Sequence, residues 1–168
     1  FHLRPDLKMM PIRGNVETRL RKLDGGECDA LVLAEAGLKR LGFADRITEL
    51  LGPPDFLPAI GQGALGLETR ANDEFAAVIA QLNDPDSHAA IIAERAFLAA
   101  MQGGCSAPLG AFGQIGGDGH VHLEGVWLGP DGRERFAAAL SAPRSEAADL
   151  GRRLADNLKK RAGAAPCP

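Results

Sequence analysis

Cys105 is the residue of this chain whose surroundings most clearly suggest chemistry. It follows Gly103-Gly104 and precedes Ser106-Ala107-Pro108, a pattern typical of a loop that exposes one side chain. The negative end of the helix expected before it disfavours a thiolate, which suits a lasting thioether better than a redox or protease nucleophile. A small buried core residue is the alternative, because most free cysteines are buried.

Three arginines are candidates for binding anions: Arg13, Arg19 and Arg40. Arg13 precedes a predicted helix N-terminus, where free backbone N–H groups and the helix dipole attract negative charge. Its guanidinium fork matches a carboxylate or a phosphate, and Arg19 follows on the same helix. Arg40 lies near the end of a second predicted helix. Each of them could instead be a solvated surface arginine, and the pattern leaves that alternative open.

The other cysteines and histidines carry weaker signals. Cys28 precedes a predicted strand and is interpreted as a packing residue, and Cys167 lies in the tail. His120 and His122 share one face of a predicted strand, but the sequence places no further ligand beside them. We therefore expect no metal site, and an odd number of cysteines without a CxxC pair indicates no disulfide framework.

The composition is ordinary for a globular protein of 168 residues. A net charge of −3 argues against a nucleic-acid partner, because such proteins usually carry a basic excess. No apolar run approaches the roughly 20 residues that span a bilayer, and no signal peptide opens the chain. A reducing, cytoplasmic location is the expectation. Because the chain opens with Phe1, it is interpreted as a fragment.

The first half of the chain predicts strands and helices in alternation. Strands are expected at three apolar runs, residues 7–12, 30–33 and 64–68. One helix should begin after Asn15 and stop at Gly25, and a second, with Ala36, Leu38 and Leu41 inside, should end at Gly42. This order implies a parallel α/β layer. Residues 52–63, rich in Pro and Gly, are interpreted as a hinge before a short helix over 73–82.

A second unit is expected from Asp84 onward. Asp84 as N-cap and Pro85 in the first turn predict a helix that Gly103-Gly104 ends. Three strands follow at about 108–116, 120–128 and 133–141, joined by Gly-rich hairpin turns. A last helix over 144–161 should bury Ala147, Leu150, Leu154 and Leu158. The expected fold is a small α+β domain with a three-stranded antiparallel sheet.

Four blocks of sequence resemble the porphobilinogen deaminases, also called hydroxymethylbilane synthases. The blocks are Arg13 to Gly25, Leu33 to Gly42, Leu57 to Ala64, and Ala93 to Leu98 followed by Gly103 to Cys105. The resemblance implies α/β domains like those of periplasmic binding proteins, then a small third domain. Residues 1–60 would form the second half of domain 2, residues 61–83 a hinge and a segment returning to domain 1, and residues 84–168 the cofactor-carrying domain 3.

The resemblance also implies a function. The family joins four porphobilinogen units into hydroxymethylbilane with release of ammonia, in heme biosynthesis. Cys105 would carry a covalent dipyrromethane cofactor through a thioether. Two further sets of residues match the family's cofactor site: the carboxylate-binding arginines Arg13, Arg19 and Arg40, and the cleft-lining positions Ala34, Gly37 and Gln62.

The family's catalytic aspartate would lie in the absent part of domain 1. No catalytic residue is therefore expected in this chain, which alone should be inactive. The complete enzyme is expected to be a monomer without membrane or nucleic-acid partners.

Two other functions are compatible with single features of the sequence. An anion-binding module of the periplasmic type would use the arginines without a cofactor. A thiol enzyme would use Cys105 as a nucleophile, but the sequence offers no partner base. The four blocks together favour the transferase.

Overall fold

The computed structural model describes residues 2–71, 73–102, 107–129 and 131–163. The chain divides into two compact units. One is Arg4–Leu51, and the other is Gly52–Pro168 together with the first three residues. Each unit is described by itself.

Helix α1 (Val16–Asp24) begins and ends where the sequence predicts. The Asn15 side chain accepts a hydrogen bond from the Thr18 N–H at 2.8 Å, which satisfies one of the free donors of the first turn. Gly25 forms the cap at the other end. The predicted N-cap and stop signal are therefore both confirmed.

Helix α2 (Glu35–Arg40) is followed by the 3-10 helix η1 (Ala44–Arg46). Leu38 of α2 is buried, as predicted. Ala36 and Leu41 were also predicted to be inside, but both are exposed, Leu41 by 49%. Leu41 is the C-cap residue and lies outside the helix, and Ala36 lies two positions from Leu38 and therefore on another face.

The three strands predicted at residues 7–12, 30–33 and 64–68 do not form in the described residues. These predictions were wrong because an apolar run alone does not make a strand, which also needs a neighbour to take its N–H and C=O groups. Apolar side chains of these segments are exposed to solvent instead: Val32 is 67% exposed and Leu65 is 90% exposed. The described residues therefore do not by themselves build the predicted parallel layer.

Helix α4 (Pro85–Met101) opens the C-terminal part of the other unit. Asp84 caps it, because its Oδ1 accepts a hydrogen bond from the Ser87 N–H at 2.7 Å. This bond holds the pKa of the Asp84 carboxyl below its usual range. The preceding helix α3 (Ala76–Ala80) is shorter than the predicted helix over residues 73–82.

The predicted three-stranded meander is confirmed. Its strands are β1 (Leu109–Ile115), β2 (His120–Leu128) and β3 (Arg135–Pro143), in the order β1-β2-β3 with antiparallel pairing. Leu123 at the centre of β2 lies opposite Gly113 and Leu140. The third strand starts two residues later than predicted, after a turn in which the Gly129 N–H donates to the Glu134 carbonyl.

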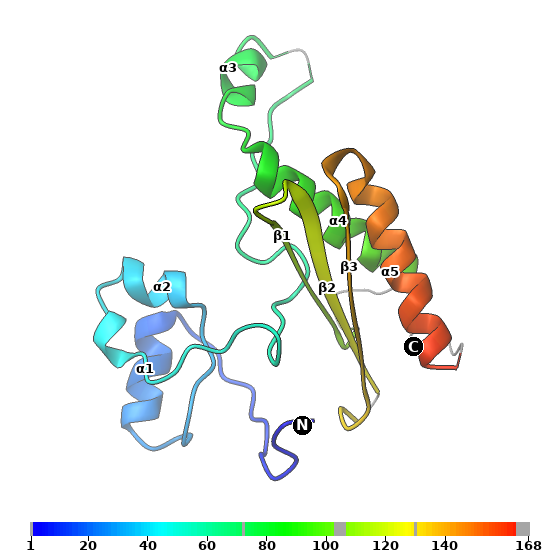
Figure 1. The fold of residues 1–168 in the computed structure, drawn as a ribbon. Coiled ribbons are helices and arrows are strands. Elements are labelled where there is room, and N and C mark those ends of the chain that lie inside the picture. Colours follow the sequence, from blue (N-terminus) through cyan, green and yellow to red (C-terminus); the bar gives the residue numbers. More distant parts are fainter. Residues whose placement is uncertain (1, 72, 103–106, 130, 164–168) are drawn as a thin grey trace. The chain divides into compact units, whose positions relative to one another are not determined.

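Helices α4 and α5 (Ala147–Arg161) lie side by side and cover one face of this sheet (Figure 1). The 3-10 helix η2 (Arg144–Glu146) occupies the start of the predicted last helix. The four side chains predicted to be inside α5 are buried. They pack with Phe97 and Leu123 in one core, while the alternate residues His122 and Glu124 of β2 lie on the opposite, half-exposed face.

The close packing of α4 against α5 requires a glycine at position 151. A Cβ added to Gly151 would lie 2.7 Å from the Phe97 backbone nitrogen and closer still to the Ala93 carbonyl oxygen. Backbone atoms cannot rotate away as a side-chain end can, so the helices would have to separate.

Gly151→Ala should therefore lower the free energy of unfolding by about 3 kcal/mol, the upper end of the usual cost of overpacking. Urea denaturation of the 168-residue chain measures this loss. Gly117→Ala is the matched control, since a methyl group there would meet no atom within 4 Å. Equal losses in the two variants would show that the α4–α5 contact is not tight at this point.

Candidate functional site

Arg13 and Arg19 lie at the N-terminal end of α1. Gly14 between them has a φ of +127°, and a Cβ there would lie 2.7 Å from Thr18 Cγ2, so this turn needs glycine. The Gly14 carbonyl accepts a hydrogen bond from Arg19 Nε at 2.7 Å. That bond fixes the guanidinium of Arg19 beside the first helical turn. Its terminal nitrogens and the exposed Arg13 have no hydrogen-bond partner in the described residues.

The three predicted arginines differ from most cations near them. Lys39 pairs with Glu35, and Arg46 pairs with Asp24, each at 2.5 Å. Arg40, the last residue of α2, is exposed and has no carboxylate partner in the part of the chain that the structure describes. In this respect it resembles Arg13 and Arg19, whose guanidinium groups also have no carboxylate partner in the described residues.

The predicted cleft residues Ala34 and Gly37 belong to the start of α2. Ala34 is the N-cap residue of that helix and makes no side-chain capping bond. A Cβ added to Gly37 would touch only Val16 Cγ2, at the ordinary contact distance of 3.9 Å. Packing within this unit therefore does not require a residue without a side chain at Gly37.

Gln62 belongs to the other compact unit. It closes a turn in which its N–H donates to the Ala59 carbonyl at 3.0 Å and its side-chain oxygen accepts from the Ala59 N–H at 3.2 Å. Gly61 inside this turn has a φ of +76°. The structure thus groups five of the predicted site residues in the unit of α1 and α2, and Gln62 separately from them.

Cys105 lies outside the described residues, as does Cys167. In sequence Cys105 falls between the end of α4 and the start of β1, as predicted. Cys28 is free and half-buried, which agrees with the packing role predicted for it.

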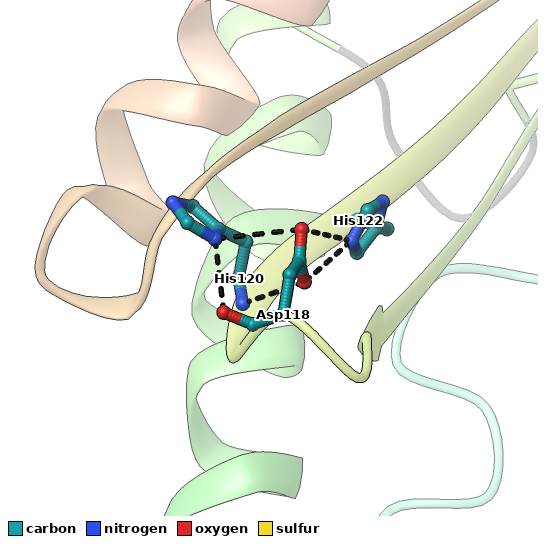
Figure 2. Close-up of polar contacts among 3 residues, drawn as sticks. All are labelled: Asp118, His120 and His122. Atoms are coloured by element: carbon teal, nitrogen blue, oxygen red, sulfur yellow. Dashed lines mark hydrogen bonds and ion pairs between the residues drawn. The ribbon is translucent and has the colours of Figure 1, made fainter.

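Asp118 was not predicted to contact the His-X-His pair, but its carboxylate lies between the two rings (Figure 2). Its Oδ1 is 3.0 Å from His122 Nε2 and accepts the His120 N–H at 3.0 Å. These contacts hold the pKa of Asp118 below its usual range, and the hydrogen bond with the His122 side chain has the largest effect. Among the described residues no group of three or more His, Cys, Asp or Glu side chains could hold a metal ion. The three residues instead close the turn before β2.

Glu94 is a buried charged residue that was not among the predicted site residues. It lies on the covered face of α4 beside Ala93 and Phe97, and it is only 5% exposed. Its carboxylate accepts hydrogen bonds from the N–H groups of Gly61 and Gly113. The available signal is a charged residue within the apolar stripe of a helix, which must be satisfied by partners when it is buried.

The described helices include none that combines the length and the apolar character needed to cross a membrane.

Two family models match the chain in succession. The model described as "Porphobilinogen deaminase, dipyromethane cofactor binding domain" covers residues 1–78, and "Porphobilinogen deaminase, C-terminal domain" covers residues 88–160. The chain belongs to the porphobilinogen deaminase family. The predicted resemblance is therefore confirmed.

Curated porphobilinogen deaminases are similar in sequence to nearly the whole of this chain. The porphobilinogen deaminase of Nitrobacter hamburgensis is 46% identical over 164 residues, which are 97% of this chain and 52% of the relative. That of Pelobacter propionicus is 50% identical over 98% of this chain and 53% of the relative. That of Thermus thermophilus is 47% identical over 96% of this chain and 54% of the relative. The chain spans about half the length of the curated relatives it matches.

The residues of this chain can be compared with the dipyrromethane cofactor that the first family model names. In that family the dipyrromethane bears acetate and propionate side chains, which are anionic at neutral pH. Arg13, Arg19 and Arg40 offer guanidinium groups that no carboxylate in the described residues neutralises. Guanidinium groups bind carboxylates in a matched two-point geometry. The donor set is thus chemically suited to an acidic pyrrole pair.

Replacing His122 with Ala should raise the pKa of Asp118 toward that of an ordinary aspartate. The lowered pKa means that this carboxylate stabilises the folded chain above its unfolded pKa, and that the contribution is lost as the pH falls through the folded value. Carbon-detected NMR titration of the Asp118 carboxyl measures the change. His88→Ala, at an exposed position on α4, serves as control. A pKa of Asp118 that does not differ between the two variants would disprove the contact.

Proposed function

We propose that this chain is part of a transferase that joins four porphobilinogen units into hydroxymethylbilane, with release of ammonia, in tetrapyrrole and heme biosynthesis. The observation that carries the proposal is the set of arginines without carboxylate partners in a chain that both family models match. The reaction builds a chain of acidic pyrroles, so the protein must hold many carboxylates at once. Fixed guanidinium groups meet that need.

Cys105 is the proposed attachment point of the dipyrromethane cofactor, through a thioether from its sulfur. Its place in a Gly-Gly-Cys sequence between α4 and β1 supports this role. When bound, the cofactor supplies the free pyrrole carbon at which the first porphobilinogen unit is added.

The other site residues bind and orient carboxylates. Arg19 is held by its bond to the Gly14 carbonyl, so its terminal nitrogens stay directed toward a ligand with little entropy left to lose. Arg13 and Arg40 add charge at the ends of α1 and α2. The absent side chain at Gly37 and the short one at Ala34 leave room for pyrrole rings. Gln62 offers a carboxamide from its turn.

The domain boundaries are proposed as the family resemblance gives them. Residues 1–60 form the second half of an α/β domain like those of periplasmic binding proteins, residues 61–83 a hinge and a segment returning to domain 1, and residues 84–168 the cofactor-carrying domain. The exposure of Val32 supports the first assignment and that of Leu65 supports the second, because each side chain lies in an apolar run that a sheet would cover.

The remaining proposals concern the complete protein. It contains the catalytic aspartate of the family outside this chain, and the chain alone is inactive. It acts as a monomer in the cytoplasm, on a small-molecule substrate and without nucleic-acid or membrane partners. The absence of a CxxC pair supports the cytoplasmic location, and the slightly acidic net charge supports the absence of a nucleic-acid partner.

Intact-mass spectrometry of the full-length enzyme tests the cofactor proposal. We expect an added mass of two linked pyrroles, and its loss in the Cys105→Ser variant. No added mass in any variant would instead support an anion-binding module. Rapid labelling of a free Cys105 by iodoacetamide would support a thiol enzyme.

Arg13→Leu and Arg19→Leu in the full-length enzyme should each lower the rate of cofactor assembly or of elongation by about tenfold or more, the usual effect of losing a hydrogen bond to a charged group. Thermal stability should change little, because neither guanidinium pairs with a carboxylate in the described residues. Arg21→Leu on the same helix is the control, since Arg21 makes only a long contact to the Thr18 hydroxyl at 3.4 Å. Unchanged turnover in both variants would count against the carboxylate role.

A further inference from the structure

Glu94 is the buried charged residue of the part of the chain that the structure describes. It lies in the middle of α4, where its side chain is 5% exposed, among residues that otherwise form the apolar core. Burial raises the pKa of this carboxyl, and hydrogen bonds from two backbone N–H groups oppose the rise. A buried carboxylate is costly, so its partners indicate what it contributes.

The two carboxylate oxygens of Glu94 bind two segments that are distant in sequence. Oε2 accepts the Gly61 N–H at 2.7 Å, and Oε1 accepts the Gly113 N–H at 2.8 Å. Gly113 belongs to β1, whose only neighbouring strand among the described residues is β2. Glu94 thus joins the free edge of the sheet to the turn that contains Gly61.

The turn held by Glu94 is the one that presents Gln62. The segment that contains this turn contacts the sheet and its core at two further places. The Pro58 carbonyl accepts a hydrogen bond from the Ala111 N–H at 3.2 Å, and Ile60 packs against the core. The Gln62 carboxamide is itself bound back to Ala59. The position of Gln62 therefore follows from the position of Gly61, which the Glu94 carboxylate fixes.

A glutamine could not replace this carboxylate. Both oxygens of Glu94 face N–H donors, whereas a carboxamide offers one accepting oxygen and one donating NH₂ group. Glu94→Gln keeps the shape of the side chain but loses one of the two bonds, and it directs an NH₂ group at a backbone N–H.

We propose that Glu94 is a positioning residue: its carboxylate anchors the Ala59–Gln62 turn to strand β1 and thereby determines where the Gln62 carboxamide meets the cofactor. This inference rests on the function proposed above, in which Gln62 lines the cofactor cleft. It goes beyond that function because it assigns a role to a buried residue that acts through Gln62.

Hydrogen–deuterium exchange and single-turnover kinetics of the full-length enzyme test this proposal together. Glu94→Gln should speed amide exchange in the peptide around Gly61 by about tenfold or more, as expected when a bond to a charged acceptor is lost. The same variant should slow porphobilinogen addition. A double variant with Gln62→Ala should be no slower than the slower single variant, because both changes act through Gln62. Glu124→Gln is the control, since Glu124 accepts no hydrogen bond in the described residues.

Several outcomes would overturn the proposal. Unchanged exchange at Gly61 in the Glu94→Gln enzyme would overturn the anchoring. Rate losses that multiply in the double variant would overturn the action through Gln62, and so would a fully active Gln62→Ala enzyme. These results are separate from the mass of the protein. A missing two-pyrrole adduct would remove the proposed function, and exchange at Gly61 would still decide whether Glu94 anchors the turn.

Discussion

The free edge of strand β1 imposes the constraint that organises the C-terminal unit. β1 is an outer strand of the sheet, so its outward N–H groups need acceptors from elsewhere in the chain. The Ala111 N–H finds the Pro58 carbonyl, and the Gly113 N–H finds the Glu94 carboxylate. Satisfying this edge brings the segment before α3 onto the small domain.

The same edge explains the close approach of α4. A Cβ added to Gly113 would lie 3.0 Å from the Ala90 carbonyl oxygen, so the glycine lets the helix come near enough for Glu94 to reach the strand. A helix held further away would leave the strand N–H without a partner, at a cost of about 1–3 kcal/mol. Packing and hydrogen bonding thus depend on each other at this point, and the Gln62 turn depends on both.

Charge in the unit of α1 and α2 divides into two groups. Cations such as Lys39 and Arg46 have a carboxylate partner, and exposed pairs of this kind contribute little to stability. Arg13, Arg19 and Arg40 have no such partner in the described residues, and neither do Lys8 and Arg21. An unpaired guanidinium suits an anion site, because one that is already paired would have to be released before it could bind a pyrrole carboxylate.

Much of the fold could be predicted from local signals. The caps Asn15 and Asp84 are bound as their types suggest, and the hairpin turns and the alternation along β2 gave the correct meander. The strands expected at residues 7–12, 30–33 and 64–68 could not be settled locally, because pairing partners decide whether an apolar run becomes a strand.

The candidate functional residues could be predicted only in part, because some of their roles also depend on partners that are distant in sequence. Residue type and motif identified Arg13 and Arg19, which the structure places at one end of α1. The role of Glu94 depends on contacts with residues 33 positions before it and 19 positions after it, which no local pattern records. The contact of Asp118 with His122 is shorter in range, but it depends on the shape of the turn.

The central claim is that one sulfur carries an acidic pyrrole pair whose carboxylates the α1 arginines neutralise. A crystal structure of the full-length enzyme, purified under reducing conditions, tests it most directly. The account predicts continuous electron density from Cys105 Sγ into two linked pyrrole rings, with the guanidinium groups of Arg13 and Arg19 within hydrogen-bond distance of their carboxylates. A free Cys105 packed in an apolar interior, with those arginines bound elsewhere, would contradict it.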